Sequence, residues 1–413
     1  MKSIFKLSVI AVAFAFPLFA IAAEPLKAVQ ITHGPQHHFF GYIGHVGNTP
    51  WNGDGRYLVA LRTSFQDHMP APNEAADVVL LDASDNYTVT KIEETRAWNF
   101  QQGTMFYWNP EAPDTQLFFN DRDPASNHVF TVLFDIRERK RIREFRFADT
   151  PFANGGVAQK GGFFLGLNYA RLAWLRPVTG YPDAFDWTAG VLHPKDDGIF
   201  KVDTRTGEKS LLVSYFQLAE ALRPLHPDVD RKALFINHPL NNREGDRVYF
   251  YARGDFEVKG ERIDVPFTIN TDGTGLTLHE THIGGHPEWA EGHLVIGSYD
   301  NQQILYDTDA KSVAGTLGDA AIFPKPGGDV ALSPSGEWLA NGARSGPDNT
   351  YVFLNRKDGR VLRSETYPID QWKEGPLRID PAPAWNRESN AITFPAIADD
   401  AARTRQLFLM PLE

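Results

Sequence analysis

The chain has 413 residues and a formal net charge of −11 at pH 7, and it contains no cysteine. The absence of cysteine excludes disulfides, thiolate metal sites and a cysteine nucleophile. The acidic balance argues against a general nucleic-acid binder or a protein that coats anionic membranes, because such proteins carry a basic surface. An anionic ligand would therefore need a local concentration of basic groups.

Residues 1–23 have the pattern of a secretory signal peptide. Two lysines precede an apolar run, and small residues follow it at the expected cleavage site. Such a segment is too short and wrongly flanked for a spanning helix. No other apolar stretch approaches the roughly 20 residues that a membrane span needs. We expect a periplasmic or secreted protein without a membrane anchor, folded as one domain over residues 24–413.

Seven copies of a turn followed by a β-like run fill the rest of the chain. Each copy starts with a turn rich in Gly, Asn or Ser and leads into a hydrophobic run. The copies are WNGDGRYLVAL from Trp51, WNPEAPDTQLFF from Trp108, GVAQKGGFFLGL from Gly156, NHPLNNREGDRVYFYA from Asn237, HPEWAEGHLVIGS from His286, ALSPSGEWLANGA from Ala331 and PAWNRESNAITFPA from Pro383. Such self-similarity marks a repeat architecture, and a four-stranded propeller blade needs about 40 to 50 residues. Seven copies predict seven blades.

Second hairpins follow the copies, as in IFKVDTRTGEKSLLVSY and FTINTDGTGLTLHE, where alternating residues flank Thr-Gly or Asp-Gly turns. The last copy is short of strands, and a strand in KAVQITHG, near residues 27–33, has no partner of its own. Pairing the two would remove the open sheet edges. The sequence thus predicts an all-β fold: a seven-bladed β-propeller of four-stranded antiparallel blades, with the ring closed by the N-terminal strand.

Two stretches between the third and fourth copies interrupt this spacing. Residues 174–194 carry Pro, Gly and Trp and are expected to form a loop over one face of the ring. The second stretch, residues 216–233, begins with FQLAEALRPL, whose apolar spacing is that of a helix.

Two families of loops would meet at one face of the ring: those before each innermost strand, and those that join the second strand to the third. Binding residues concentrate on such loops while strands hold them rigidly. The polar residues on these loops are His37, His38, Asn99, Gln101, Gln102, Asn237, His238, His286, Asp329, Asp380, Arg62, His68, Asn120, Arg122, His128, Asn168, Tyr169, Arg171, Arg253, Tyr299 and Arg344. Because arginine binds carboxylate and sulfate in planar bidentate geometry, this set favours a polyanionic sugar as ligand.

Structural roles compete with binding roles for several of these residues. His238 would serve equally well in a bond to a neighbouring blade, because buried polar groups need partners. Asn120 and Arg122 could form a turn with a surface charge. Tyr169 and Arg171 would point the same way in a strand, where side chains repeat with a period of two, and could instead make an inter-blade contact.

Histidines form two groups in the sequence. Of His37 and His38, only one can face the channel in alternating structure. His279, His282, His286 and His293 lie close together in sequence, which is compatible with a metal site. Since this second group crosses a blade boundary, we expect its members to point to different places.

Six segments of the chain carry a resemblance to a known family. They are HHFFGY from His37, PWNGDGRYLVAL from Pro50, TRAWNFQQGTMFYW from Thr95, FFNDRD from Phe118, LNYARL from Leu167 and INHP from Ile236. Together these segments resemble the β-propeller polysaccharide lyases, the seven-bladed secreted ulvan lyases more closely and the oligogalacturonate lyases more distantly. The resemblance implies cleavage of a uronic-acid-containing polysaccharide by β-elimination. Export favours a sulfated, ulvan-like polymer over small pectin oligomers.

The same resemblance implies roles for individual residues. His238 is similar in position to the catalytic histidine of the oligogalacturonate lyases. Tyr169 would be an acid or base, Arg171 would neutralise the substrate carboxylate, and His128 or His38 would be a second proton-transfer or subsite group. The residues expected to bind substrate are His37, Asn99, Gln101, Asn120, Arg122, Asn237, Arg253, Tyr299 and Arg344.

The resemblance to oligogalacturonate lyases also raises the question of a metal. Those enzymes hold manganese with histidines, and His286 fits one such position, but Asp329 and Ala382 stand near where further histidines would be expected. A divalent metal ion thus stays open without being required. The expected partner is an anionic polysaccharide or oligosaccharide, with no nucleic acid, and the expected state is a monomer.

Two functions of other classes stay open as alternatives. One is a non-catalytic periplasmic binding or scaffold module of the TolB kind, since a fold does not imply a function. The other is a glycoside hydrolase, which needs two facing carboxylates such as Asp329 and Asp380.

Overall fold

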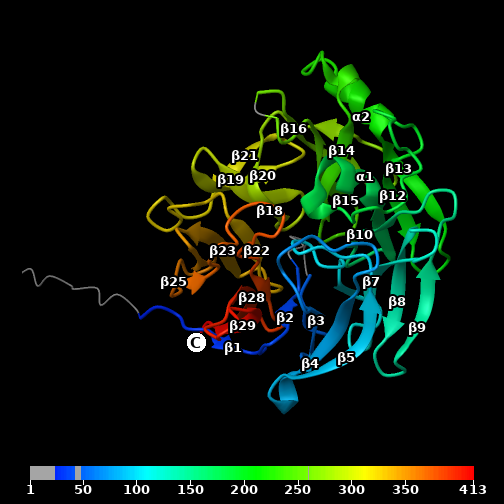
Figure 1. The fold of residues 1–413 in the computed structure, drawn as a ribbon. Coiled ribbons are helices and arrows are strands. Elements are labelled where there is room, and N and C mark those ends of the chain that lie inside the picture. The colour runs from blue at the N-terminus through cyan, green and yellow to red at the C-terminus, as the bar shows by residue number, and fades with distance from the viewer. Residues whose placement is uncertain (1–23, 42–47, 259) are drawn as a thin grey trace, which may run out of the picture.

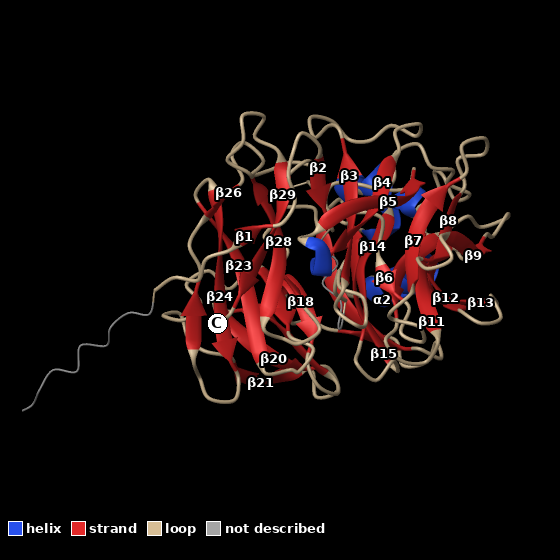
Figure 2. Cartoon of the chain, turned by 90° about the horizontal axis from the view of Figure 1, so that it is seen from below, coloured by secondary structure: helices blue, strands red, loops and turns tan. Residues whose placement is uncertain are grey.

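The computed structural model describes residues 24–41, 48–258 and 260–413. Its sheets follow one another around a common centre, and the blue N-terminal strands lie beside the red C-terminal ones (Figure 1). Strands run through the whole molecule, with short helices among them (Figure 2). The prediction of an all-β propeller is confirmed. The predicted signal peptide, residues 1–23, lies outside the described residues.

Five sheets have four strands each, paired antiparallel. They are β2 to β5 (His37–Phe39, Tyr57–Thr63, Ala76–Asp82, Thr88–Thr95), β6 to β9 (Tyr107–Trp108, Gln116–Arg122, Val129–Asp135, Lys140–Phe145), β10 to β13 (Ala153–Val157, Phe163–Leu167, Gly198–Asp203, Lys209–Ser214), β14 to β17 (Leu234–Asn241, Arg247–Gly254, Ile263–Asn270, Thr277–Leu278), and β1, β29, β28 and β27 (Val29–Gln30, Arg405–Pro411, Ala391–Ile397, Ala384–Trp385).

A sixth sheet has nine strands. It runs in the order β21, β20, β19, β18, β22, β23, β24, β25, and β26 also pairs with β24. The strands are β18 (Gly284–Trp289), β19 (Leu294–Tyr299), β20 (Gln302–Asp307), β21 (Ser312–Thr316), β22 (Asp329–Leu332), β23 (Trp338–Ser345), β24 (Asp348–Asn355), β25 (Val361–Arg363) and β26 (Tyr367–Pro368).

This strand pairing corrects the predicted count of seven separate blades closed by an N-terminal strand. Strands β18 and β22 pair in parallel at His286 and Asp329, which merges two groups of strands into one sheet. Gly285, at φ +76°, lets the two backbones approach, since a Cβ there would lie 2.7 Å from the Gly328 carbonyl oxygen. Strand β1 pairs with β29 within one of the five four-stranded sheets. Alternation within a hairpin predicts local pairing but carries no signal for a parallel contact 43 residues apart.

Helix α1 (Tyr169–Leu175) ends where the first stretch begins, and helix α2 (Tyr215–Leu222) lies at the start of the second. The short 3-10 turns η2 (Pro177–Thr179) and η3 (Val229–Arg231) follow them, and η1 spans Ala83–Asp85. Helix α2 confirms the predicted helical periodicity and starts with a capping box between Ser214 and Gln217. Helix α1 contradicts the strand expected at Tyr169 and Arg171, because the Asn168 side chain caps a helix there. Within the described part of the chain, every helix is too short or too polar to cross a membrane.

Tryptophans of the repeated segments connect neighbouring sheets. The indole N–H of Trp108 donates to the Pro50 carbonyl oxygen at 2.9 Å, that of Trp289 to Leu240 at 2.8 Å, and that of Trp385 to Ala331 at 2.9 Å. Each ring is buried, so its apolar surface is removed from water while its N–H group has a hydrogen-bond acceptor in the neighbouring sheet. The repeated tryptophan is therefore a packing device that fixes adjacent sheets.

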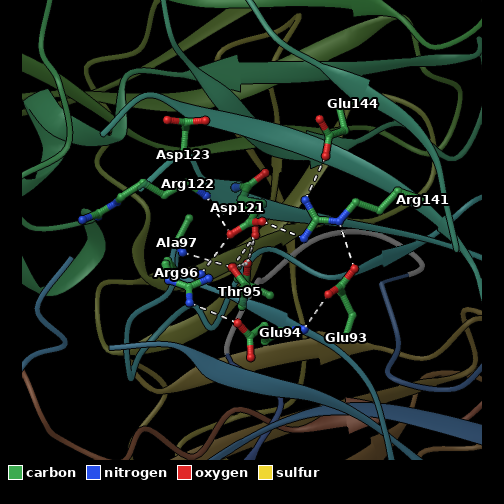
Figure 3. A network of polar contacts seen from close by, with 12 residues as sticks. Glu93, Glu94, Thr95, Arg96, Ala97, Asp121, Arg122, Asp123, Arg141 and Glu144 are labelled. Atoms are coloured by element: carbon green, nitrogen blue, oxygen red, sulfur yellow. Dashed lines mark hydrogen bonds and ion pairs between the residues drawn. The ribbon is translucent and has the colours of Figure 1, made fainter. Parts of the chain in front are cut away.

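A polar network also joins the sheet of β2 to β5 to the sheet of β6 to β9 (Figure 3). Arg141 lies at its centre and pairs with Glu93 at 2.9 Å, Asp121 at 2.8 Å and Glu144 at 2.9 Å. Asp121 also accepts a hydrogen bond from the backbone N–H of Arg96 at 3.0 Å. Arg141 of the same sheet thus balances the charge of the buried Asp121 carboxylate, while Glu93 and the Arg96 N–H connect this pair to the neighbouring sheet.

Replacing Arg141 with Met should lower the free energy of unfolding by about 2 kcal/mol, because a largely buried carboxylate loses its counter-ion. The neighbouring Lys140→Met is the matched control, since Lys140 pairs with Glu138 in solvent. Urea denaturation followed by tryptophan fluorescence measures both. Equal midpoints for the two variants would contradict a structural role for the network.

Candidate functional site

Two histidines predicted in separate repeats lie side by side. The rings of His238 in β14 and His286 in β18 have their centroids 5.0 Å apart. The Nδ1 atom of His286 is hydrogen bonded to Oδ1 of Asp329 in β22. The other Asp329 oxygen accepts the backbone N–H of Ala382 at 2.8 Å, which fixes the carboxylate. A carboxylate on Nδ1 orients the imidazole and selects the tautomer in which Nε2 carries the basic lone pair.

The backbone at His238 adopts an uncommon conformation. Its φ is +53°, and the register between β14 and β15 shifts between Asn237 and Leu240. The Asn237 side-chain oxygen accepts the His238 N–H at 3.0 Å and holds this geometry. Positive φ is uncommon for a residue other than glycine, and such positions cluster at functional sites. The irregularity re-aims the His238 side chain, as bulges beside active sites do.

A pocket of about 380 Å³ opens beside His286. Its charged lining residues are His286, Lys325, Asp329, Arg344, Arg378 and Asp380. Counting His286 as neutral, three cations face two carboxylates. The pocket is therefore locally positive in an acidic protein.

Asp380 organises the arginines of this pocket. It accepts Arg378 Nε at 2.9 Å, Arg344 Nη2 at 3.4 Å and Gln101 Nε2 at 2.6 Å. Burial alone would raise the pKa of Asp380, but the charge of Arg378, with His286 and the Gln101 hydrogen bond, holds it below its usual value. Asp380 is thus ionised and holds both guanidinium groups at the pocket.

A second pocket, of about 460 Å³, adjoins the first and shares Lys325 and Gly327 with it. It is also lined by His282 and by Tyr299, whose side chain is exposed. Tyr299 thus presents a ring next to the charged pocket, where a sugar could stack. Of the residues expected to bind substrate, Tyr299, Arg344, Gln101 and Asn237 lie in or against this region.

Tyr169 and Arg171 make structural contacts away from these pockets. The hydroxyl of Tyr169 donates to the Asn154 carbonyl oxygen at 2.9 Å, and its ring stacks on Tyr181. Arg171 is buried and donates to the carbonyl oxygens of Leu234, Val191 and Leu192. The expected shared strand face is wrong because the two residues lie on α1. We assign neither a proton-transfer nor a carboxylate-binding role to them.

His37, His38 and His128 have contacts with other residues than the His238 and His286 pair. His38 is buried, and its Nδ1 is hydrogen bonded to Gln406 Oε1 at 2.9 Å. The His37 Nδ1 accepts the backbone N–H of Arg405 at 3.0 Å. The His128 ring packs 4.8 Å from that of Phe185.

Two further residues expected to bind substrate make hydrogen bonds to the backbone, and a third is buried. Asn120 donates to the Asn154 carbonyl at 2.8 Å and to the Tyr181 hydroxyl at 3.0 Å, and Asn99 accepts the backbone N–H groups of Gln101 and Gln102. Arg122 is buried beneath the surface, which corrects the alternative of a surface charge.

Two residues of the charged pocket were missed from the sequence. Arg378 stands two positions before Asp380 in RIDPAPAW, and Lys325 lies in the KPGG turn. The spacing of Arg378 and Asp380 was a usable signal, because alternate residues in extended chain share a side. Asp329 and Asp380 were considered as a pair of hydrolase carboxylates. Each is instead bound to a cationic or imidazole partner, which removes the basis for that alternative.

The donor set does not fit a manganese site. Among the described residues, no group of three or more His, Cys, Asp or Glu side chains could hold a metal ion. The four histidines that lie close together in sequence point to different places, as expected. His279 is hydrogen bonded to Thr268 and Tyr306, His282 to Asp264, and His293 to Asp309. His286 directs its Nδ1 to Asp329.

Two solved oligogalacturonate lyases have similar structures. One, in complex with manganese, superposes with a TM-score of 0.60 at 16% sequence identity, over 95% of this chain and 94% of that one. The other, from Vibrio parahaemolyticus, gives a TM-score of 0.62 at 13% identity, over 94% of each chain. Identities this low show a shared fold alone. They support the distant resemblance to oligogalacturonate lyases, and the closer resemblance to ulvan lyases stays a prediction.

Other comparisons add no functional argument. TolB from Acinetobacter baumannii gives a TM-score of 0.39 at 12% identity, which carries no weight for the scaffold alternative. Neither a protein-family model nor a curated protein sequence matches the chain.

The buried His38 predicts a pH-dependent stability. Burial lowers the pKa of His38 from 6.5 to about 4, so the unfolded chain takes up this proton first as the pH falls. The free energy of unfolding should fall between pH 6.5 and 4, with His38 contributing about 1–3 kcal/mol of that loss. Urea unfolding at several pH values should give a flatter profile for His38→Gln. The exposed His33→Gln should retain the wild-type slope, and identical slopes for all three proteins would contradict the assignment.

Proposed function

We propose that the protein is a polysaccharide lyase that cleaves a uronic-acid-containing polysaccharide by β-elimination at His238 and His286. The observation that carries this proposal is the His286 and Asp329 pair, 5.0 Å from a second imidazole and beside a pocket lined by Arg344, Arg378 and Lys325. The fold shared with two oligogalacturonate lyases supports the class of reaction.

In this proposal His286 is the base that removes the C5 proton of the uronate. Asp329 orients the imidazole and stabilises the imidazolium that forms. The electron pair of the C5–H bond passes into an enolate of the adjacent carboxylate, and Arg344 and Arg378 stabilise that negative charge. This electron pair then forms the C4–C5 double bond as the bond between C4 and the leaving oxygen breaks.

His238 is proposed as the acid that protonates the leaving oxygen. Its ring lies close enough to His286 for both imidazoles to face one sugar unit. One imidazole can act as the base and its neighbour as the acid, because histidine titrates near neutral pH and serves in either role. No co-reactant is needed, since the proton removed from C5 is balanced by the proton given to the leaving group.

The substrate proposed first is a sulfated, ulvan-like polymer, with an oligogalacturonate as the alternative. Residues 1–23 are proposed to export the protein to the periplasm or medium, where such polymers are found, and the protein is proposed to act as a monomer over residues 24–413. The positive pocket suits either acidic sugar.

His286→Ala should reduce kcat on the preferred uronate polymer by about 10²- to 10⁴-fold, because it removes the general base. The rate is measured from the ultraviolet absorbance of the unsaturated product. His293→Ala is the matched control, since His293 also pairs with an aspartate, Asp309 at 2.6 Å. His293 precedes the first residue of β19, whereas Gly284, at the start of the strand that carries His286, pairs near the last residue of β19. Similar losses in both variants, or turnover by His286→Ala at the wild-type rate, would refute the assignment. No product on ulvan, polygalacturonate, alginate or glucuronan would favour the scaffold module.

His238→Asn tests the acid and keeps a residue that tolerates positive φ. Its rate on polymer should fall by about 10²-fold or more, because the leaving oxygen would depart without a proton. A uronate with an activated aryl leaving group needs no such proton and should react at nearly the wild-type rate. An equal loss on both substrates would assign His238 to binding instead.

A further inference from the structure

Three arginines surround one phenylalanine next to the proposed site. The guanidinium groups of Arg176, Arg253 and Arg262 lie 4.6, 4.5 and 3.9 Å from the centroid of the Phe256 ring. They come from separate places: the end of α1, strand β15, and the residue before β16. We call Arg176, Arg253, Arg262 and Phe256 the arginine cage.

The cage has less negative charge than its cations require. The largely buried Asp264 accepts Arg253 Nε at 2.7 Å, pairs with Arg262, and lies 3.1 Å from His282 Nε2. Arg176 pairs only with Glu257 among the described acidic residues, and the Glu257 side chain is 65% exposed. The single carboxylate of Asp264 thus contacts two guanidinium groups and one imidazole.

Burial and neighbouring like charges both disfavour the charged form of Arg176. Burial, followed by the charges of Arg378, Arg253 and Arg262, lowers its pKa to about 10. Its Nε is buried and has no hydrogen-bond partner among the described residues. An anion in the cage would relieve this repulsion and supply the missing acceptor.

The cage lies next to the histidine pair. Arg253 stacks on Tyr251 at 4.6 Å, and the Tyr251 ring is 6.3 Å from that of His238. His282, which contacts Asp264, lines the pocket that shares Lys325 with the pocket of His286. A chain of sugar units with one residue at His286 could therefore reach the cage with a neighbouring unit.

We propose that the arginine cage is a second oxyanion subsite, which binds a carboxylate or sulfate group on the sugar unit next to the one held at His286. This assignment rests on the proposed function for the position of the substrate. Planar guanidinium groups bind such oxyanions in bidentate geometry, and the Phe256 ring keeps the three groups apart and oriented. The subsite selects substrates with charge on consecutive units.

Binding is measured by isothermal titration calorimetry with the full chain carrying His286→Ala, so that substrate is not consumed. The probes are an unsulfated galacturonate trimer and a sulfated ulvan oligosaccharide. Arg176→Gln, Arg262→Gln and their double variant remove the cage charges while the buried Arg253 stays. Arg56→Gln is the matched control, because Arg56 also stacks on an aromatic ring, that of Tyr57, and pairs with a carboxylate, that of Asp82. Arg56 directly precedes β3, and His37 pairs with the opposite end of that strand.

The double variant should bind at least one probe about 10- to 100-fold more weakly, because two charge-assisted contacts are lost. The control should bind with wild-type affinity, and thermal unfolding should show that all variants are folded. A loss confined to the sulfated probe assigns the subsite to sulfate, and a loss confined to the trimer assigns it to a carboxylate.

Unchanged affinity for both probes in the folded double variant would overturn the subsite, whether or not the wild type is a lyase. The same holds if the His286→Ala protein binds neither probe. A loss of affinity in a protein whose wild type yields no unsaturated product would support the subsite and overturn the proposed function instead.

Discussion

The contact between His286 and Asp329 links the architecture to the chemistry. It lies where β18 and β22 pair in parallel, so the backbone pairing that joins two groups of strands into one sheet also brings the Asp329 carboxylate to the imidazole that it orients. Gly285 makes the approach possible, and the Ala382 N–H fixes the second carboxylate oxygen. A rigid base is one whose partners are themselves held by the fold. Here the fold holds them through backbone pairing, and His238 is presented to the same point by an irregular segment of β14.

Two largely buried carboxylates hold four arginines of this acidic chain beside the pockets. Asp380 holds Arg344 and Arg378, and Asp264 holds Arg253 and Arg262. Each carboxylate has more positive partners than it can neutralise, so positive charge is left over at the pockets while the net charge of the chain stays at −11. Preorganised positive charge of this kind stabilises an anion without reorganisation at the moment of reaction.

The sequence predicted the propeller and several members of the site, but not how they combine. Alternation and turn signals are local, so they revealed the hairpins, and they could not reveal the parallel pairing of β18 with β22 that changes the sheet count. His238 and His286 were selected because both open predicted inner strands. Tyr169 and Arg171 were misplaced because Asn168 starts a helix where the pattern suggested a strand. Arg378 was missed although its spacing of two residues from Asp380 was a usable signal, because its role depends on an ion pair with Asp380.

The central claim is that the protein breaks a uronate chain by elimination and without water. Incubation with ulvan and with polygalacturonate in oxygen-18 water, followed by mass spectrometry of the products, tests it most directly. Elimination predicts one unsaturated fragment and one saturated fragment that together have the mass of the substrate and carry no label from the cleavage step. Incorporation of oxygen-18 at the new chain end would identify a hydrolase, and recovery of both polymers intact would contradict a lyase.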